Sequence, residues 1–268
     1  MTSKKTAVSV SSILVLLLLL TQPLFSQRTK SSLSAGNQRH SEKSLKDNRY
    51  FFNFINTTIT NSGTEEEISL FIEAARRDMI SRMLYMKFAF NPAMNEIRTT
   101  QLILIELFRK IAVREIDSAT LLLNEIAPEV LKTGNKASKK YMSLGYRSVD
   151  WAEKVMIMSD NLPEKNYSIK IYEYVKAIKN AKYCKRYGII ALIENRIPPE
   201  KRGRINYNKF DNVKNLINQY IPENQEKYNK IHLDNFYKIE NSDSVYDKFT
   251  SSPELEKIPE YKNYLMEN

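Results

Sequence analysis

The chain has few of the side chains that carry most nucleophilic and metal chemistry: one cysteine, Cys184, and two histidines, His40 and His232. The histidines fall in polar sequence and lack metal-ligand spacing, so we expect both to be solvated. Cys184 shares a helical face with apolar residues, which favours a small buried thiol over a nucleophile. Glycine-rich phosphate loops and Gly-x-Ser-x-Gly motifs are also absent from the sequence. We therefore expect no catalytic, cofactor-binding or metal-binding residues.

Three carboxylates stand near an expected helix junction: Glu106, Glu115 and Asp117. A pair of carboxyl groups roughly 5–9 Å apart can hydrolyse glycosidic bonds, so a cell-wall glycan hydrolase is one alternative function. Glu115 and Asp117 are two residues apart, however, and such residues point to different sides of a helix. The interpretation we favour is that all three are solvated residues near helix ends.

Charge is the strongest feature of the sequence. Residues 164–210 contain twelve Lys or Arg and four Glu, a net charge of +8, whereas residues 211–268 carry a net charge of −4. A helical wheel and the loop after it give one candidate face for binding polyanions, interleaved with tyrosines: Lys176, Lys179, Lys182, Arg186, Lys201, Arg202 and Arg204. The alternative is a solvated face that the acidic tail partly neutralises. Lys185 falls in the apolar sector, where it either snorkels or marks a bend.

Helices are the elements that must position these residues. Six glycines in 268 residues are few for all-β or nucleotide-binding α/β folds, and 42% hydrophobic residues suffice for a core. Thr64 to Glu67 reads as a capping box, and apolar residues from Ile68 to Phe90 follow a helical period. Residues 50–60 favour a first helix, with a strand as the alternative. We predict an all-α fold.

Prolines recur at a nearly constant spacing along the middle of the chain. Pro92, Pro128, Pro163 and Pro198 stand 36, 35 and 35 residues apart, and the last three each follow an apolar helical end. Because proline interrupts helices, this spacing is typical of stacked helical hairpins. The pattern over residues 64–198 resembles the tetratricopeptide repeat, which implies a right-handed array whose surface binds partners. The alternative is an irregular helical bundle in which the proline spacing is coincidental.

The N-terminal residues have the three parts of a secretory signal peptide. Lys4 and Lys5 precede a short apolar run over residues 7–20, and Ser26 offers a small residue for cleavage. The run is shorter than the ~20 residues that span a bilayer, so we expect cleavage after Ser26 and no stable membrane span afterwards. An uncleaved anchor is the alternative. The final address is the periplasm, the cell surface or the medium.

The sequence thus divides into a signal peptide (1–26), a flexible serine-rich linker (27–49), a helical-repeat domain (50–222) and an acidic C-terminal cap or tail (223–268). The expected architecture is an irregular, α-solenoid-like array of antiparallel hairpins with a short extended tail. The expected function is that of a non-enzymatic scaffold or interaction protein, whose partner is a protein or an envelope component. An exported polyanion-binding protein, with an anionic glycan as its partner, is the main alternative, and export argues against nucleic acid.

Overall fold

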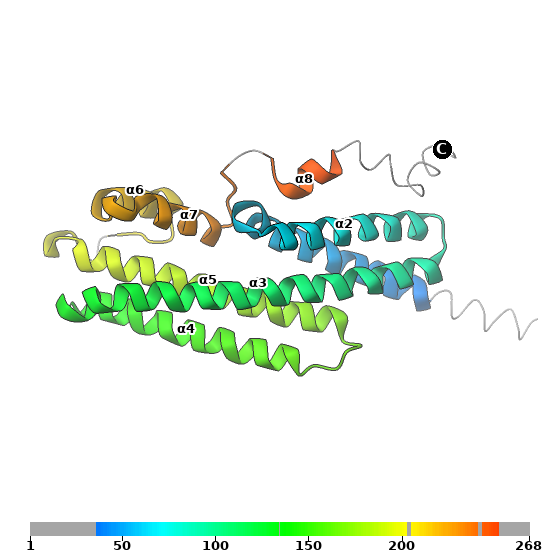
Figure 1. Cartoon of the computed structure of the whole chain (residues 1–268), viewed down its shortest axis with the longest axis horizontal. Helices are drawn as coiled ribbons and strands as arrows, with labels where there is room; N and C mark the ends of the chain where they lie inside the picture. The colour runs from blue at the N-terminus through cyan, green and yellow to red at the C-terminus, as the bar shows by residue number, and fades with distance from the viewer. Residues whose placement is uncertain (1–35, 134, 203–204, 241–242, 252–268) are drawn as a thin grey trace, which may run out of the picture.

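The computed structural model describes residues 36–133, 135–202, 205–240 and 243–251 (Figure 1). All regular elements in these residues are helical, so the predicted all-α class is confirmed. The first helix covers residues 36–62, and the other α-helices are α2 (Glu65–Met86), α3 (Phe90–Thr133), α4 (Lys136–Asp160), α5 (Tyr167–Arg196), α6 (Phe210–Tyr220), α7 (Gln225–Asn235) and α8 (Val245–Thr250). Two short 3-10 helices cover Pro199–Lys201 and Pro222–Asn224.

The long helices lie side by side in an elongated antiparallel bundle, consistent with the predicted array (Figure 1). The turn between α2 and α3 lies at one end of this bundle, beside the beginning of the first helix. α6 and α7 lie at the opposite end against α5, and α8 lies along α2. The expected C-terminal cap or tail, residues 223–268, contains α7 and α8, and its residues 252–268 lie outside the described chain.

The start of α2 confirms the capping box read from the sequence. The Glu67 N–H donates to Thr64 Oγ1 at 3.2 Å, and the Thr64 N–H donates to Glu67 Oε2 at 2.9 Å. Glu65, Glu66 and Glu67 also place negative charge at the positive end of the helix dipole.

The proline spacing does not mark equivalent helix boundaries. Pro163 lies between α4 and α5, and Pro198 follows α5. Pro128, in contrast, lies inside α3, a helix of 44 residues that ends at Thr133. The expectation that a helix ends at Pro128 is therefore wrong. Ile126 and Val130 on either side are buried in the core, and this packing outweighs the ~3 kcal/mol that an interior proline costs. The resemblance to tetratricopeptide repeats stays a prediction.

Residues 36–49 belong to the first helix, so this part of the expected flexible linker is wrong. Their buried contacts are polar, which conceals the helical period from a count of apolar residues. Asn48 is fully buried: its side-chain N–H donates to Asp78 Oδ1 at 2.8 Å, and its Oδ1 accepts from Gln101 at 3.1 Å. The Tyr172 hydroxyl likewise donates to Asp47 at 3.0 Å. Residues 27–35 lie outside the described chain.

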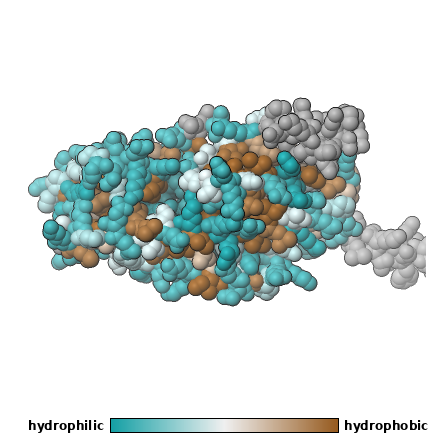
Figure 2. All heavy atoms as spheres, in the orientation of Figure 1, coloured by the Kyte–Doolittle hydropathy of each residue, from teal (hydrophilic) through white to brown (hydrophobic). Residues whose placement is uncertain are grey.

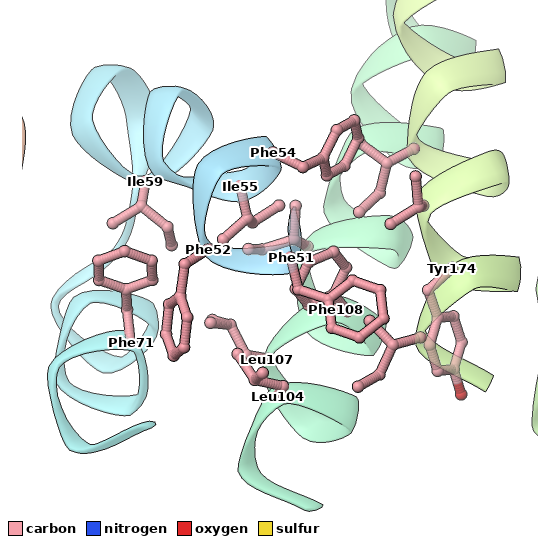
Figure 3. Close-up of a cluster of buried hydrophobic side chains, with 14 of the residues drawn as sticks. Phe51, Phe52, Phe54, Ile55, Ile59, Phe71, Leu104, Leu107, Phe108 and Tyr174 are labelled. Carbon is pink, nitrogen blue, oxygen red and sulfur yellow. The ribbon is translucent and has the colours of Figure 1, made fainter. Parts of the chain in front are cut away.

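The bundle contains two hydrophobic cores in series. The first is rich in aromatic rings and joins the first helix to α2, α3 and α5; it includes Phe51, Phe52, Phe54, Ile55, Phe71, Phe108 and Tyr174 (Figure 3). The second core joins α3, α4 and α5 to α6 and α7. On α3 the first core ends at Ala112 and the second begins at Ile116, and on α5 the corresponding residues are Ile178 and Ala181. The residues between these boundaries include the charged Arg114 and Glu115 on α3 and Lys179 on α5.

Candidate functional site

A groove of about 1040 Å³ opens on the surface of the described chain. Its lining residues place it over the middle of α3, between the start of α2 and α7. Three segments far apart in the sequence line it: residues 64–67, residues 109–125 of α3, and Lys227 and Ile231 of α7. The groove therefore depends on two separate contacts: α2 packs against α3, and α7 packs on α5, which brings Lys227 and Ile231 beside α3.

An ion pair lies at each of the two rims of the groove. On the α2 side, Lys110 Nζ lies 2.9 Å from Glu66 Oε1. On the α7 side, Lys227 Nζ lies 2.5 Å from Glu125 Oε2. Both pairs are partly exposed, so each contributes little stability, but together they leave the rims nearly neutral.

The floor of the groove is apolar and partly open to solvent. Leu121 is 69% exposed and Val113 is also exposed, while Leu122 beside them is buried in the second core. Figure 2 shows hydrophobic atoms gathered near the middle of this face, within a mostly hydrophilic surface. A large exposed aliphatic side chain in a concave site is a typical contact for the apolar side chain of a ligand.

Arg114 connects the groove to a belt of buried charges. Its Nε donates to Glu67 Oε1 at 3.0 Å and its Nη1 donates to the Ser62 carbonyl at 2.7 Å. Its Nη2 also lies 3.9 Å from Glu115, which is buried and 2.6 Å from Lys185 Nζ. These residues, together with Lys182 and Asp234, are called the ionic belt below.

Lys182 completes the belt on the α7 side. Its Nζ lies 2.9 Å from Asp234 Oδ2 and donates to Thr58 Oγ1 at 2.8 Å and to the Asp234 carbonyl at 3.0 Å. Burial lowers the pKa of Lys182, and the neighbouring carboxylates of Asp234 and Glu115 oppose that shift. The belt thus ties the first helix and α7 to α5.

The structure does not bring the predicted polyanion face together. Lys182, expected on the exposed side of α5, is buried in the ionic belt, because the first helix and α7 cover that side of the helix. Lys185 does not snorkel: it stays in the interior and pairs with Glu115. Both departures have the same cause, since a helical wheel shows one helix and not the carboxylates that other helices bring to it.

The remaining basic residues of α5 are mostly engaged within the chain. Lys176 is exposed but lies 2.6 Å from Glu173. Lys179 lies over the Phe54 ring and donates to the Tyr50 hydroxyl at 3.3 Å. Arg186 donates to the Tyr207 carbonyl at 2.8 Å and stacks on the Phe236 ring.

The basic loop after α5 is only partly described. Lys201 is exposed, whereas Arg202 is half-buried and donates to the Ile197 carbonyl at 3.0 Å. Arg204 lies outside the described residues. The seven predicted residues therefore do not form a continuous basic surface in the described chain.

The residues first considered for chemistry occupy structural positions. Cys184 is buried as expected, and burial raises the pKa of its thiol to about 12. His232 was expected to be solvated, and this expectation is wrong, because the side chain is buried. Its ring stacks on Phe210, and one ring nitrogen lies 2.9 Å from the Phe210 carbonyl. His40 is exposed.

The three carboxylates considered for glycan hydrolysis do not share a site. Glu115 is buried against Lys185 and is not a solvated helix-end residue. Glu106 is exposed and lies 3.9 Å from Lys110, while Asp117 lines the groove. Among the described residues, moreover, no group of three or more His, Cys, Asp or Glu is arranged to hold a metal ion.

Sequence reasoning did not single out the groove, although one signal was present. Leu121, Leu122 and Leu123 are consecutive, and successive residues on a helix turn by about 100°. Three adjacent leucines cannot all face one core, so one of them had to be exposed unless it packed on another neighbour. The rims could not be found in this way, because they depend on where α2 and α7 lie.

The fold and the groove define this protein as an elongated all-α bundle with an open surface groove and buried ion pairs in its interior. The comparison with protein families gives it a more specific place. Its sequence matches the family described as surface protein adhesin OmpL37 over residues 35–263, and the chain belongs to that family. No curated protein and no solved structure matches the chain.

Family membership agrees with the export expected from the sequence, since this is a family of surface proteins. Within the described part of the chain, no helix has both the length and the apolar character of a membrane span. The cleavage after Ser26 stays a prediction, because residues 1–35 are not described.

Proposed function

We propose that this chain is a non-enzymatic adhesin that binds a polypeptide ligand through the groove over α3. The observation that carries the proposal is the exposed Leu121 in a groove of about 1040 Å³. The family description supports binding as the general function.

The chemistry of the groove favours a polypeptide over a polyanion. Lys110 and Lys227 are already paired with Glu66 and Glu125, so the rims offer little net positive charge to a sulphated or phosphorylated chain. An apolar floor between charges of both signs suits a peptide segment with an aliphatic or aromatic side chain between polar residues. Fully burying one such side chain contributes roughly 1.5–3 kcal/mol.

Two leucines of α3 provide a matched test. Leu121 in the groove is 69% exposed, and Leu131, which is not among the groove residues, is 63% exposed. Binding of the exported chain is measured by surface plasmon resonance on a panel of purified extracellular-matrix and serum proteins, with heparin as a polyanion. For a protein that binds, Leu121→Asp should weaken affinity at least tenfold, about 1.4 kcal/mol, whereas Leu131→Asp should not change it.

Two outcomes would contradict the proposal. Equal effects of the two substitutions would show that the groove is not the contact surface. Binding to heparin alone, weakened by charge reversal at Lys176 and Lys201, would favour the polyanion-binding alternative instead.

A further inference from the structure

The turn between α2 and α3 carries an aromatic side chain in an unfavourable position. Phe88 has a backbone φ of 59°, in the left-handed region that glycine and asparagine tolerate best, and its side chain is 79% exposed. Such strain in a non-glycine residue persists only where the surroundings enforce it, and it is concentrated at functional sites.

Tyr237 provides a comparison within the same chain. It is the other non-glycine residue of the described chain with a positive φ, at 52°. Its ring packs against Phe54 and lies over Lys182 Nζ, so contacts inside the protein compensate for the strain. The ring contact found for Phe88 is an edge-to-face contact with Phe90, which leaves most of its surface in solvent.

The aromatic residues beneath Phe88 form a support for it. Phe90 contacts Phe88 at a centroid distance of 6.1 Å and Tyr85 at 5.4 Å, both edge to face. Met86, on the other side of the turn, is also exposed. Met86 and Phe88 are thus two exposed apolar residues at this end of the bundle, and we call them the apolar tip.

Positive charge surrounds the apolar tip. The beginning of the first helix lies beside this turn, where the Asn37 side chain donates to Asn91 (Figure 1). Arg39 and Lys43 of that helix are exposed. The neighbouring acid, Glu42, is 2.7 Å from Lys46 and is neutralised by it.

Exposed apolar side chains within a basic surround match the apolar interior and anionic headgroups of a lipid bilayer. An apolar pocket of a protein partner would bind the apolar side chains but would not require the basic residues around them.

We propose that the apolar tip inserts into the surface of an anionic lipid bilayer. Met86 and Phe88 enter the boundary between headgroups and acyl chains, and Arg39 and Lys43 lie against anionic headgroups. The contact is peripheral and uses a surface separate from the α3 groove, so it does not depend on the proposed function.

The single tryptophan of the chain makes a direct test feasible. Trp151 is exposed on α4, and the double variant Phe88→Trp, Trp151→Phe moves the only tryptophan to the tip of the full chain. Phosphatidylcholine vesicles with and without phosphatidylglycerol are added, and emission and quenching by brominated lipid are recorded. We expect a blue shift and quenching at position 88 with phosphatidylglycerol vesicles only, and neither for Trp151 in the parent chain.

Several results would overturn the proposal. These are unchanged emission at position 88 with anionic vesicles, an equal shift with pure phosphatidylcholine, or a shift that depends on protein concentration without vesicles, which would identify a second copy as the partner. The variant Phe88→Gly, which relieves the positive φ, should bind anionic vesicles at least tenfold more weakly in the Trp151→Phe background while keeping its thermal stability. Undiminished binding by this variant would also contradict the proposal.

Discussion

Lys185 Nζ and Glu115 Oε2 lie 2.6 Å apart inside the bundle, with both side chains almost completely buried. Lys185 is on α5 and Glu115 on α3, at the level where the first hydrophobic core ends and the second begins. Burying either charge alone would be energetically unfavourable, because the charged group would lose its hydration without gaining an oppositely charged partner.

Removing one partner should therefore be costly. We expect Glu115→Ala to destabilise the protein by about 3–5 kcal/mol, because Lys185 would be left charged and buried. Urea unfolding followed by circular dichroism measures the change. Glu106→Ala on the same helix is the control: Glu106 is exposed, and its loss should cost no more than about 0.5 kcal/mol. A loss of the same size in both variants would show that the buried pair has no special role.

The contact between Lys182 and Asp234 should determine how firmly α7 is held. In Asp234→Ala the buried Lys182 loses its carboxylate, so we expect faster amide hydrogen exchange in α7 and little change in the middle of α3. Asp211→Ala, at an exposed position of α6, should leave both patterns unchanged. If α7 exchanges at its original rate in Asp234→Ala, this ion pair does not hold the helix.

His232 should make the C-terminal helices sensitive to acid. Burial lowers its pKa below 6.5, and nearby Arg186, Lys214 and Lys238 contribute in the same direction. The unfolded chain then binds a proton at a higher pH than the folded chain, so stability falls as the pH drops from 6.5 toward the folded pKa. Thermal melts at pH 7 and pH 5 should show a smaller difference for His232→Gln than for the parent chain. An identical difference would assign the acid sensitivity to other groups.

The sequence predicted those parts of the fold that are encoded within single helices. The capping box of Thr64 and Glu67 and the burial of Cys184 depend on residues close to one another in the chain. The anomalous place of Lys185 on the helical wheel was also visible, but its explanation lies 70 residues away at Glu115. The same limit explains the wrong expectation for Lys182, whose partner Asp234 arrives on α7.

Buried polar contacts also explain why the first helix was read too short. Asn48 is buried against Asp78 and Gln101, so the helix that contains it is stabilised by hydrogen bonds that no apolar period reveals. Pro128 gave the opposite error, since a local signal for a helix end was outweighed by packing on both sides. The groove could not be predicted from α3 alone. Its floor is formed by residues of α3, but its rims include residues of α2 and α7, which are distant in the sequence.

The continuity of α3 separates the two exposed surfaces by a fixed distance. From Phe90 to Asp117 the helix rises about 40 Å, at about 1.5 Å per residue. The Debye length at physiological salt is about 8 Å, so charges at one surface are almost completely screened at the other. Substitutions around the groove can therefore alter ligand preference without changing the potential at the tip, and the two surfaces are free to vary independently.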